Sequence, residues 1–212
     1  MTTAKLRSVL AMALTLVFTG ALAARTITIS ADDCDRMGVI SATAPRLGWS
    51  NAFGANMYHT YAQLHLYSNM AILIRYPLDR IPKGQRITKA EWTVPSTYTG
   101  GVKQRLSVRR ILAEWGTGVC HDYRMVLPKK LEWARPGGLG VNVDRAAKTS
   151  AVFTMLNAGM QTVDVTEDIE LWYTSAAPNR GWILNLDDSV IYMPAPYPTG
   201  ADWKLQITYE PK

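Results

Sequence analysis

The sequence predicts an all-β fold, a jelly-roll-like antiparallel β-sandwich with one short helix, preceded by a signal peptide. Three observations support this prediction. Apolar and polar residues alternate over several short stretches, turns containing Pro and Gly separate these stretches, and one later stretch has apolar residues at helical spacing. We therefore divide the chain into a signal peptide, residues 1–23, and one β-sandwich domain, residues 24–212, whose length suits a single domain.

The first residues have the features of a signal peptide. Lys5 and Arg7 form a charged start, residues 9–18 an apolar run, and Ala21-Leu22-Ala23 a cleavage site with small residues. An uncleaved membrane anchor is the alternative, but the apolar run is shorter than the roughly 20 residues that span a bilayer. We expect a secreted protein, extracellular, at the cell surface or in the periplasm, without a membrane span after cleavage.

The charge of the chain restricts its partners. The net charge is +6, and it falls to +4 when Lys5 and Arg7 are removed with the signal peptide. This mild positive charge allows an acidic polysaccharide or an anionic surface as partner but does not require one. We expect no nucleic-acid partner, because the exported chain has no basic tract.

An acidic turn follows the first predicted strand, residues 25–29. Asp32, Asp33 and Asp35 fall within four positions and offer hard oxygen ligands of the kind that bind calcium. The alternative is a solvated turn whose Asp side chains bind their own backbone N–H groups, and the spacing, which is not that of an EF-hand, favours it. A structural calcium ion here is the one cofactor that we consider, and none is required.

The two cysteines, Cys34 and Cys120, both lie in the exported part, where a disulfide is chemically allowed. A bridge would close a loop of 86 residues and contribute roughly 4 kcal/mol in the chain-entropy model. It requires the two Cα atoms to lie within about 7 Å of each other. The alternative is two small buried residues or two unpaired thiols.

The centre of the predicted domain is the stretch from Ile72 to Val94. Two alternating runs, residues 72–78 and 87–94, are separated by Ile-Pro-Lys-Gly at 81–84, which turns the chain. Pro77 has no N–H for the ladder, so the first strand ends there or lies at an edge. Further strands are expected at 102–112, around Phe153, at 163–165, at 182–186 and at 205–209.

A short helix is predicted to begin near Asp164 and to close one end of the sandwich. Asp164 or Thr166 can accept hydrogen bonds from the first backbone N–H groups of this helix. Val165, Ile169 and Trp172 have helical spacing and should face the core. Five tryptophans in apolar positions are assigned to core and turn packing: Trp92, Trp115, Trp133, Trp172 and Trp182.

These motifs resemble a known family. An aromatic-x-Leu-Asp at 76–79, Ile-Pro-x-Gly at 81–84 and Ile-x-x-Ala-x-aromatic at 87–92 are similar to the DNRLRE domain, a secreted β-sandwich related to alginate-binding carbohydrate modules. Residues 111–115, 133–138 and 164–185 agree with this family in order and spacing, so the resemblance covers nearly all of the exported chain. It implies a domain that binds carbohydrate. The family usually occurs as a module of larger proteins.

The sequence contains no recognisable catalytic motif. His59, His65 and His121 are dispersed and form no metal-ligand spacing. A nucleophile elbow, a His-Glu-x-x-His motif and a phosphate-binding glycine loop are all absent from the sequence. A glycosidase requires a carboxylate pair, and the carboxylates that could supply one are Glu114, Asp122, Asp187 and Asp188. We expect a protein that is not an enzyme, with a polysaccharide-active hydrolase or lyase as the weakest alternative.

Three arginines and two groups of aromatic residues are the candidate ligand-binding residues. Arg75, Arg105 and Arg109 fall on the polar faces of predicted strands, where paired strands would line up their guanidinium groups for the carboxylates of a uronic-acid polymer. The alternative is solvated arginines that pair with local acids. Aromatic residues that could stack on sugar rings occur in a loop within residues 43–66 (Trp49, Tyr58 and Tyr61) and in a Pro-rich loop near the C-terminus (Tyr192, Tyr197 and Trp203). Such residues can instead pin a long loop to the core.

The expected function is non-catalytic binding of a polysaccharide or cell-surface glycan, which could be acidic. The alternative is a structural or adhesive subunit of an extracellular matrix or appendage, which would contact matrix or surface proteins. A binding module should be retained by a glycan, whereas a structural subunit should associate with itself at physiological salt.

Overall fold

The structure is a computed structural model. It describes residues 23–43, 45–46, 49–50, 65–66, 70–96, 103–155, 158–186, 193–194 and 203–212. Residues 1–22 of the predicted signal peptide lie outside the described residues. Within the described part, no helix has the length and apolar character needed to cross a membrane.

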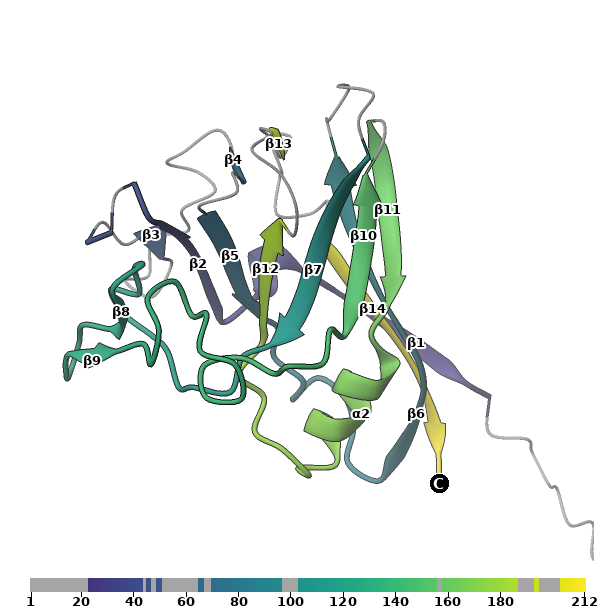
Figure 1. The fold of residues 1–212 in the computed structure, drawn as a ribbon. Coiled ribbons are helices and arrows are strands. Elements are labelled where there is room, and N and C mark those ends of the chain that lie inside the picture. Colours follow the sequence, from purple (N-terminus) through teal and green to yellow (C-terminus); the bar gives the residue numbers. More distant parts are fainter. Residues whose placement is uncertain are drawn as a thin grey trace, which may run out of the picture.

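Two antiparallel sheets pack face to face, which confirms the predicted all-β sandwich (Figure 1). The first sheet has four strands in the order β1 (Arg25–Ser30), β14 (Lys204–Pro211), β6 (Gln85–Ser96) and β11 (Gly159–Asp164). The second has six in the order β10 (Ala151–Met155), β7 (Gln104–Arg110), β12 (Trp182–Leu186), β5 (Met70–Arg75), β2 (Arg36–Ser41) and β3 (Trp49–Ser50).

The smaller elements lie around these sheets. Two short ladders join β13 (Met193–Pro194) to β4 (His65–Leu66) and β8 (Tyr123–Met125) to β9 (Leu131–Glu132). A 3-10 turn, η1 (Ala31–Asp33), connects β1 to β2, and the helix α2 (Thr166–Tyr173) connects β11 to β12.

The Ile-Pro-Lys-Gly turn connects the two sheets, because it joins β5 of the six-stranded sheet to β6 of the four-stranded sheet. Gly84 has φ of 77°, a conformation that favours glycine. The side chains on either side of the turn meet across the sandwich, where the Trp92 indole N–H donates to the Tyr76 hydroxyl at 3.1 Å. The stretch expected at the centre of the domain therefore ties its two layers together.

Aromatic side chains fill the main core between the sheets. The rings of Trp92 and Trp182 stack with centroids 5.0 Å apart, and Trp172 of α2 lies 4.7 Å from Trp182. All five tryptophans assigned to packing are buried, as predicted. The assignment of Trp203 to a sugar platform is wrong, because this side chain is only 2% exposed and its ring lies 6.1 Å from that of Trp92.

The helix begins as the sequence indicates. The Asp164 carboxylate accepts the Thr166 N–H at 2.8 Å, while the Thr166 hydroxyl accepts the N–H of Ala90 on β6. Asp164 thus binds the first turn, and Thr166 attaches the helix to the neighbouring sheet. Val165, Ile169 and Trp172 are all buried in the main core, as predicted.

A long connection, residues 111–150, covers part of the outer face of the six-stranded sheet. We call it the 111–150 connection. Its contact with the sheet forms a second, smaller core of buried residues: Ile40, Ala71, Leu73 and Ile183 from the sheet, and Ile111, Trp115, Val119 and Trp133 from the connection. We expected arginine side chains on a flat outer surface of the sheet. The connection covers this part of the six-stranded sheet, so the surface is not open here.

One buried carboxylate organises the later part of the connection. Asp144 is 2% exposed and accepts hydrogen bonds from the backbone N–H groups of Ala134, Arg135 and Gly140, each at 2.9 Å. A Cβ at Gly140 would lie 2.5 Å from the Asp144 carboxylate, so a larger residue there would have to displace this side chain. Because Asp144 binds three separate backbone positions, it holds residues 134–146 in a compact turn.

Candidate functional site

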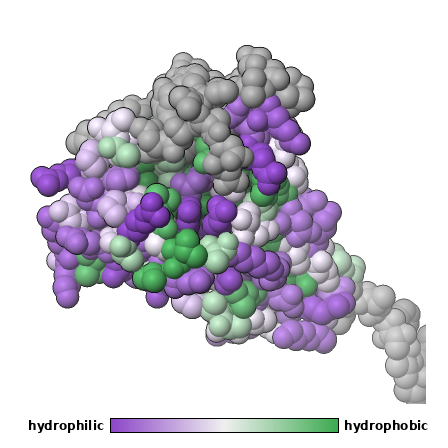
Figure 2. All heavy atoms as spheres, viewed as in Figure 1, coloured by the Kyte–Doolittle hydropathy of each residue, from purple (hydrophilic) through white to green (hydrophobic). Residues whose placement is uncertain are grey.

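The positive charge of the chain is concentrated in β7 and the 111–150 connection. Residues 103–150 contain ten Lys and Arg but four Asp and Glu, a net charge of +6. The rest of residues 24–212 contains eleven Lys and Arg but thirteen Asp and Glu, a net charge of −2. The mild overall charge therefore conceals a basic segment on one side of the sandwich. Figure 2 shows hydrophilic residues across this side, with a few hydrophobic ones near its middle.

Arg75 lies at the end of β5, directly opposite Arg36 of β2. Its guanidinium binds the Asp35 carboxylate through two nitrogens, with Nε 2.9 Å from Oδ1 and Nη2 in contact with Oδ2. The side chain is 19% exposed. Gly181 lets the chain before β12 approach the backbone at the end of β5, because its φ is 78° and a Cβ there would collide with the carbonyl oxygen of Ile74. A two-point pair of this kind fixes the orientation of the guanidinium plane.

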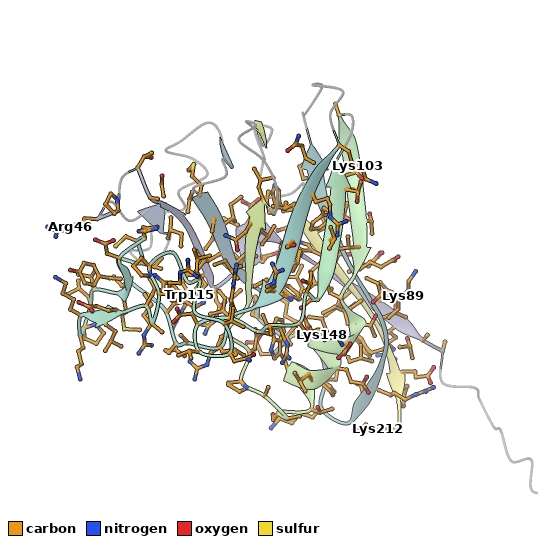
Figure 3. The ribbon with its side chains drawn as sticks, in the orientation of Figure 1. Arg46, Lys89, Lys103, Trp115, Lys148 and Lys212 are labelled. Carbon is orange, nitrogen blue, oxygen red and sulfur yellow. The ribbon has the colours of Figure 1, made fainter. Side chains whose placement is uncertain are left out.

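Two further arginines share one carboxylate beside this pair. Glu114 of the connection accepts from Arg36 Nη1 on Oε1 at 2.7 Å and from Arg180 Nη1 on Oε2. Arg36 also donates to the carbonyl oxygen of Trp115, and the Trp115 indole N–H donates to the carbonyl oxygen of Arg180 at 2.7 Å. The beginning of the connection is thus fastened to the sheet through arginine side chains. Figure 3 shows Trp115 over the lower end of β2 and β5.

Arg124 of β8 completes the group. Its Nη1 donates to the carbonyl oxygen of Glu114 at 2.5 Å, and its Nε donates to that of Glu132 at 3.1 Å. We call Arg36, Arg75, Arg124 and Arg180 the arginine cluster. All four side chains are half-buried, and together with the two carboxylates that they bind, Asp35 and Glu114, they have a net charge of +2.

Sequence reasoning found Arg75 but missed the other three members of the cluster. Arg180 precedes the strand predicted at 182–186, and Arg36 and Arg124 occur in stretches without a strong pattern. The available signal was the Glu114-Trp115 pair directly after a strand, since a carboxylate beside a large aromatic residue often needs basic partners when it is partly buried.

Arg105 and Arg109 lie on β7, away from Arg75. Arg109 pairs in register with Ile183 of β12, which in turn faces Leu73 of β5, so all three arginines point to the outer side of the sheet. β12 separates β7 from β5, so the direct pairing of these two strands, on which the predicted alignment of the three guanidiniums depended, is not found. Arg105 is exposed and Arg109 is half-buried.

Apart from Trp203, the residues of the predicted aromatic platforms have no described side chains. Tyr58, Tyr61, Tyr192 and Tyr197 lie outside the described residues. Trp49 belongs to β3, opposite Val39, but its side chain is also outside the described part. Stacking of sugars on these residues stays a prediction.

Five large apolar side chains of the 111–150 connection are exposed: Leu112, Val126, Leu127, Val141 and Val143. Val141 is 54% exposed, Val143 60% and Leu112 36%. The Leu112 N–H donates to the carbonyl oxygen of Asp144 at 2.7 Å, so the backbone of Leu112 lies beside that of the valine-containing turn. The basic segment thus also offers apolar contact area.

The acidic turn binds arginines in this structure. Asp33 accepts hydrogen bonds from Ser30 and Arg80, and the bond from Arg80 is the main cause that lowers the pKa of its carboxyl. Asp35 binds Arg75 of the arginine cluster, and Asp32 is exposed. The described residues include no group of three His, Cys, Asp or Glu side chains placed to hold a metal ion. Calcium binding by Asp32, Asp33 and Asp35 stays a prediction.

The structure does not join Cys34 and Cys120 by a disulfide. Cys34 is buried in the main core, whereas Cys120 is buried under the connection, where its carbonyl oxygen accepts the Trp133 indole N–H at 2.9 Å. The structure therefore agrees with the alternative of two small buried residues.

A small pocket of about 130 Å³ lies at the beginning of α2. Its floor is Asp168, whose side chain is 7% exposed and binds Arg110 Nε at 3.1 Å and the Trp182 indole N–H at 2.7 Å. Burial raises the pKa of the Asp168 carboxyl, and hydrogen bonds from Ser150 and Trp182 and the charge of Arg110 oppose this rise. Because both carboxylate oxygens are bound by the protein, this network attaches α2 to the six-stranded sheet.

The two described carboxylates of the proposed glycosidase group, Glu114 and Asp122, each contact basic side chains. Glu114 is held by arginines, and Asp122 contacts His121 at 3.2 Å and Arg46 at 3.7 Å. Asp187 and Asp188 lie outside the described residues.

No known family model and no curated protein matches this chain.

Proposed function

We propose that this protein is a secreted, non-catalytic module that binds an acidic polysaccharide through the arginine cluster and the basic segment around it. The observation that carries the proposal is the charge distribution, +6 over residues 103–150 against −2 over the rest of residues 24–212. A concentrated positive face attracts a polyanion strongly even when the net charge of the protein is small.

The arginine cluster suits carboxylate groups for two reasons. A guanidinium presents a planar fork of N–H donors that matches a carboxylate, which makes arginine well suited to bind uronic acids. In addition, Asp35 and Glu114 already orient the guanidiniums of Arg75, Arg36 and Arg180, so little side-chain entropy is lost when a ligand binds.

The exposed apolar residues of the connection support a sugar polymer over a simple anion. Leu112, Val141 and Val143 can contact the C–H face of a pyranose while neighbouring cations bind its acidic groups. A polymer can also contact several Lys and Arg side chains at once. Because these contacts belong to one ligand chain, individually weak contacts together give a higher affinity. The resemblance to the DNRLRE domain is consistent with such a ligand and stays a prediction.

The test is binding to a soluble polyuronate, compared with a neutral glucan, by calorimetry or affinity electrophoresis. We expect the polyuronate to bind and the neutral glucan not to bind, with an affinity that falls as salt rises. Arg75→Gln/Arg124→Gln should raise the Kd about tenfold or more, since it removes two charge-assisted contacts.

A matched control removes the same charge from the opposite side of the sandwich. Lys89→Gln/Lys204→Gln lies on the outer face of the four-stranded sheet, where both lysines are exposed, and should leave the Kd within about twofold. Figure 3 shows Lys89 far from Trp115. Arg105→Gln, at an exposed position of β7, provides a basic-segment variant that disturbs no packing and should weaken binding by a smaller factor. Equal losses in both double variants, or no binding to any polyuronate, would refute the proposal.

A further inference from the structure

The outer edge of β1 is unpaired in the described structure. β1 is the last strand of the four-stranded sheet and pairs only with β14, in an unbroken register from Arg25↔Tyr209 to Ser30↔Lys204. Its sequence between these ends, Thr26-Ile27-Thr28-Ile29, contains no charge, Pro or Gly, which are the residues that usually protect an edge from other strands.

The other edges of the two sheets differ from β1. β11 and β10, at the ends of their sheets, lie side by side where the sandwich closes (Figure 1). β3, the remaining edge, has two residues. Among the described strands, β1 is therefore the one long edge strand without such a neighbour beside its unpaired edge.

The exposure of Ile27 shows that the edge is open. Ile27 is on the inner side of the sheet, in the same phase as Ile29, yet it is half-buried while Ile29 is completely buried. Thr26 and Thr28, on the outer side, are both exposed. A further strand alongside β1 would cover the remaining surface of Ile27 and pair the open backbone groups.

The charges at the two ends of this edge are complementary to each other. Arg25 begins the strand and is exposed, and Asp32 and Asp33 follow its end, also exposed. When two copies of such a strand pair in the antiparallel direction, the basic start of each lies beside the acidic end of the other.

We propose that the occupant of this edge is β1 of a second copy, which pairs with it about a two-fold axis and joins two four-stranded sheets into one continuous sheet. Opposite residues of an antiparallel pair point to the same side, so the axis must pass through a residue rather than between two. An axis at Thr28 pairs Ile27 with Ile29 of the second copy, on the inner side, and Thr26 with Ser30 on the outer side. Arg25 then lies next to Asp32 of the second copy. This interface uses the opposite sheet from the arginine cluster and does not depend on the proposed function.

The register supplies a direct test, because Thr28 faces the same residue of the second copy at a Cβ separation of roughly 5 Å. We expect sedimentation equilibrium of the purified protein to show a concentration-dependent dimer. Thr28→Lys places two lysines opposite each other and should weaken the dimer about tenfold or more, as should Thr28→Glu. An equimolar mixture of the two variants should recover the association as a heterodimer.

The matched control is Thr162→Lys, which adds the same charge to the same face of the sheet on β11, at its other edge. It should leave the dimer constant within about twofold. A protein that stays monomeric at all concentrations would overturn the proposal. So would variants at Thr28 and Thr162 that weaken the dimer equally, or a mixture of the Lys and Glu variants at Thr28 that fails to recover it. Circular dichroism of each variant identifies any loss of fold, and Thr28→Val, which keeps the edge uncharged, should dimerise like the unaltered chain.

Discussion

At the scale of single residues, buried carboxylates hold this fold together in two different ways. Asp144 accepts three backbone N–H groups, all within the 111–150 connection. Asp168 instead joins α2 to the six-stranded sheet through Arg110 and Trp182. The first carboxylate shapes one segment and the second connects two elements, so we expect their removal to have different consequences.

The Asp168 carboxyl should give the stability a specific pH dependence. Burial raises its pKa above the ordinary 3.8, so the folded protein binds this proton more tightly than the unfolded chain does. The contribution of this carboxyl to the free energy of unfolding therefore increases as pH falls through its pKa in the folded protein. It becomes constant below its pKa in the unfolded chain. Asp168→Asn cannot titrate. The stability of the unaltered protein relative to this variant, measured by urea unfolding from pH 7 to pH 3.5, should rise as pH falls, and a difference that is constant or decreases would contradict this assignment.

At the scale of elements, the sequence predicted the strands better than it predicted what covers them. Alternation located β1, β6, β7 and β14, and helical spacing located α2. The sequence did not lead us to predict that a segment covers the outer face of the six-stranded sheet, although the sequences of β5 and β12 indicate it. Both contain unbroken apolar runs, Met-Ala-Ile-Leu-Ile and Trp-Ile-Leu, which are typical of strands buried on both faces.

The arginine cluster could not be predicted from the sequence, for a physical reason. Arg36 and Arg75 meet because β2 pairs with β5, and Arg124 and Arg180 join them through Glu114, where the 111–150 connection folds back over the sheet. No local pattern encodes such a meeting, since it depends on packing between segments that are distant in the chain. The predicted pair of Arg105 and Arg109, in contrast, followed directly from the period of a single strand.

Asp144 tests how far the connection depends on one side chain. Asp144→Asn keeps the size of the side chain but replaces one acceptor oxygen by an amide, and should lower the free energy of unfolding by about 3 kcal/mol. Chemical unfolding measures this loss, and hydrogen exchange should locate the faster exchange in residues 134–146. The control is Asp122→Asn on the same connection, where the partly exposed carboxylate pairs with His121 and Arg46 and the loss should stay below about 1 kcal/mol. Equal losses in the two variants would show that the turn does not depend on Asp144.

At the scale of the whole molecule, the six-stranded sheet is the middle layer between two cores. Its inner face packs against the four-stranded sheet, and its outer face packs against the 111–150 connection, which has a net charge of +2. The binding surface that we propose is therefore attached to the fold through the second core. We expect the stability of that core and the geometry of the arginine cluster to depend on each other, because the Trp115 side chain belongs to the core while its carbonyl oxygen accepts a hydrogen bond from Arg36.

Neighbouring residues on β12 test whether the second core is part of the cooperative fold. Ile183 faces the second core and Leu184 the main core, and both are at most 1% exposed. Ile183→Ala and Leu184→Ala should each lower the free energy of unfolding by about 2–5 kcal/mol, the range for large-to-small substitutions in packed cores. Unfolding followed by tryptophan fluorescence and by far-UV circular dichroism should give one coincident transition in both variants. A loss below about 1 kcal/mol in Ile183→Ala alone would mean that the connection lies loosely on the sheet, and a loosely held connection could not orient the guanidiniums that the proposed polysaccharide binding requires.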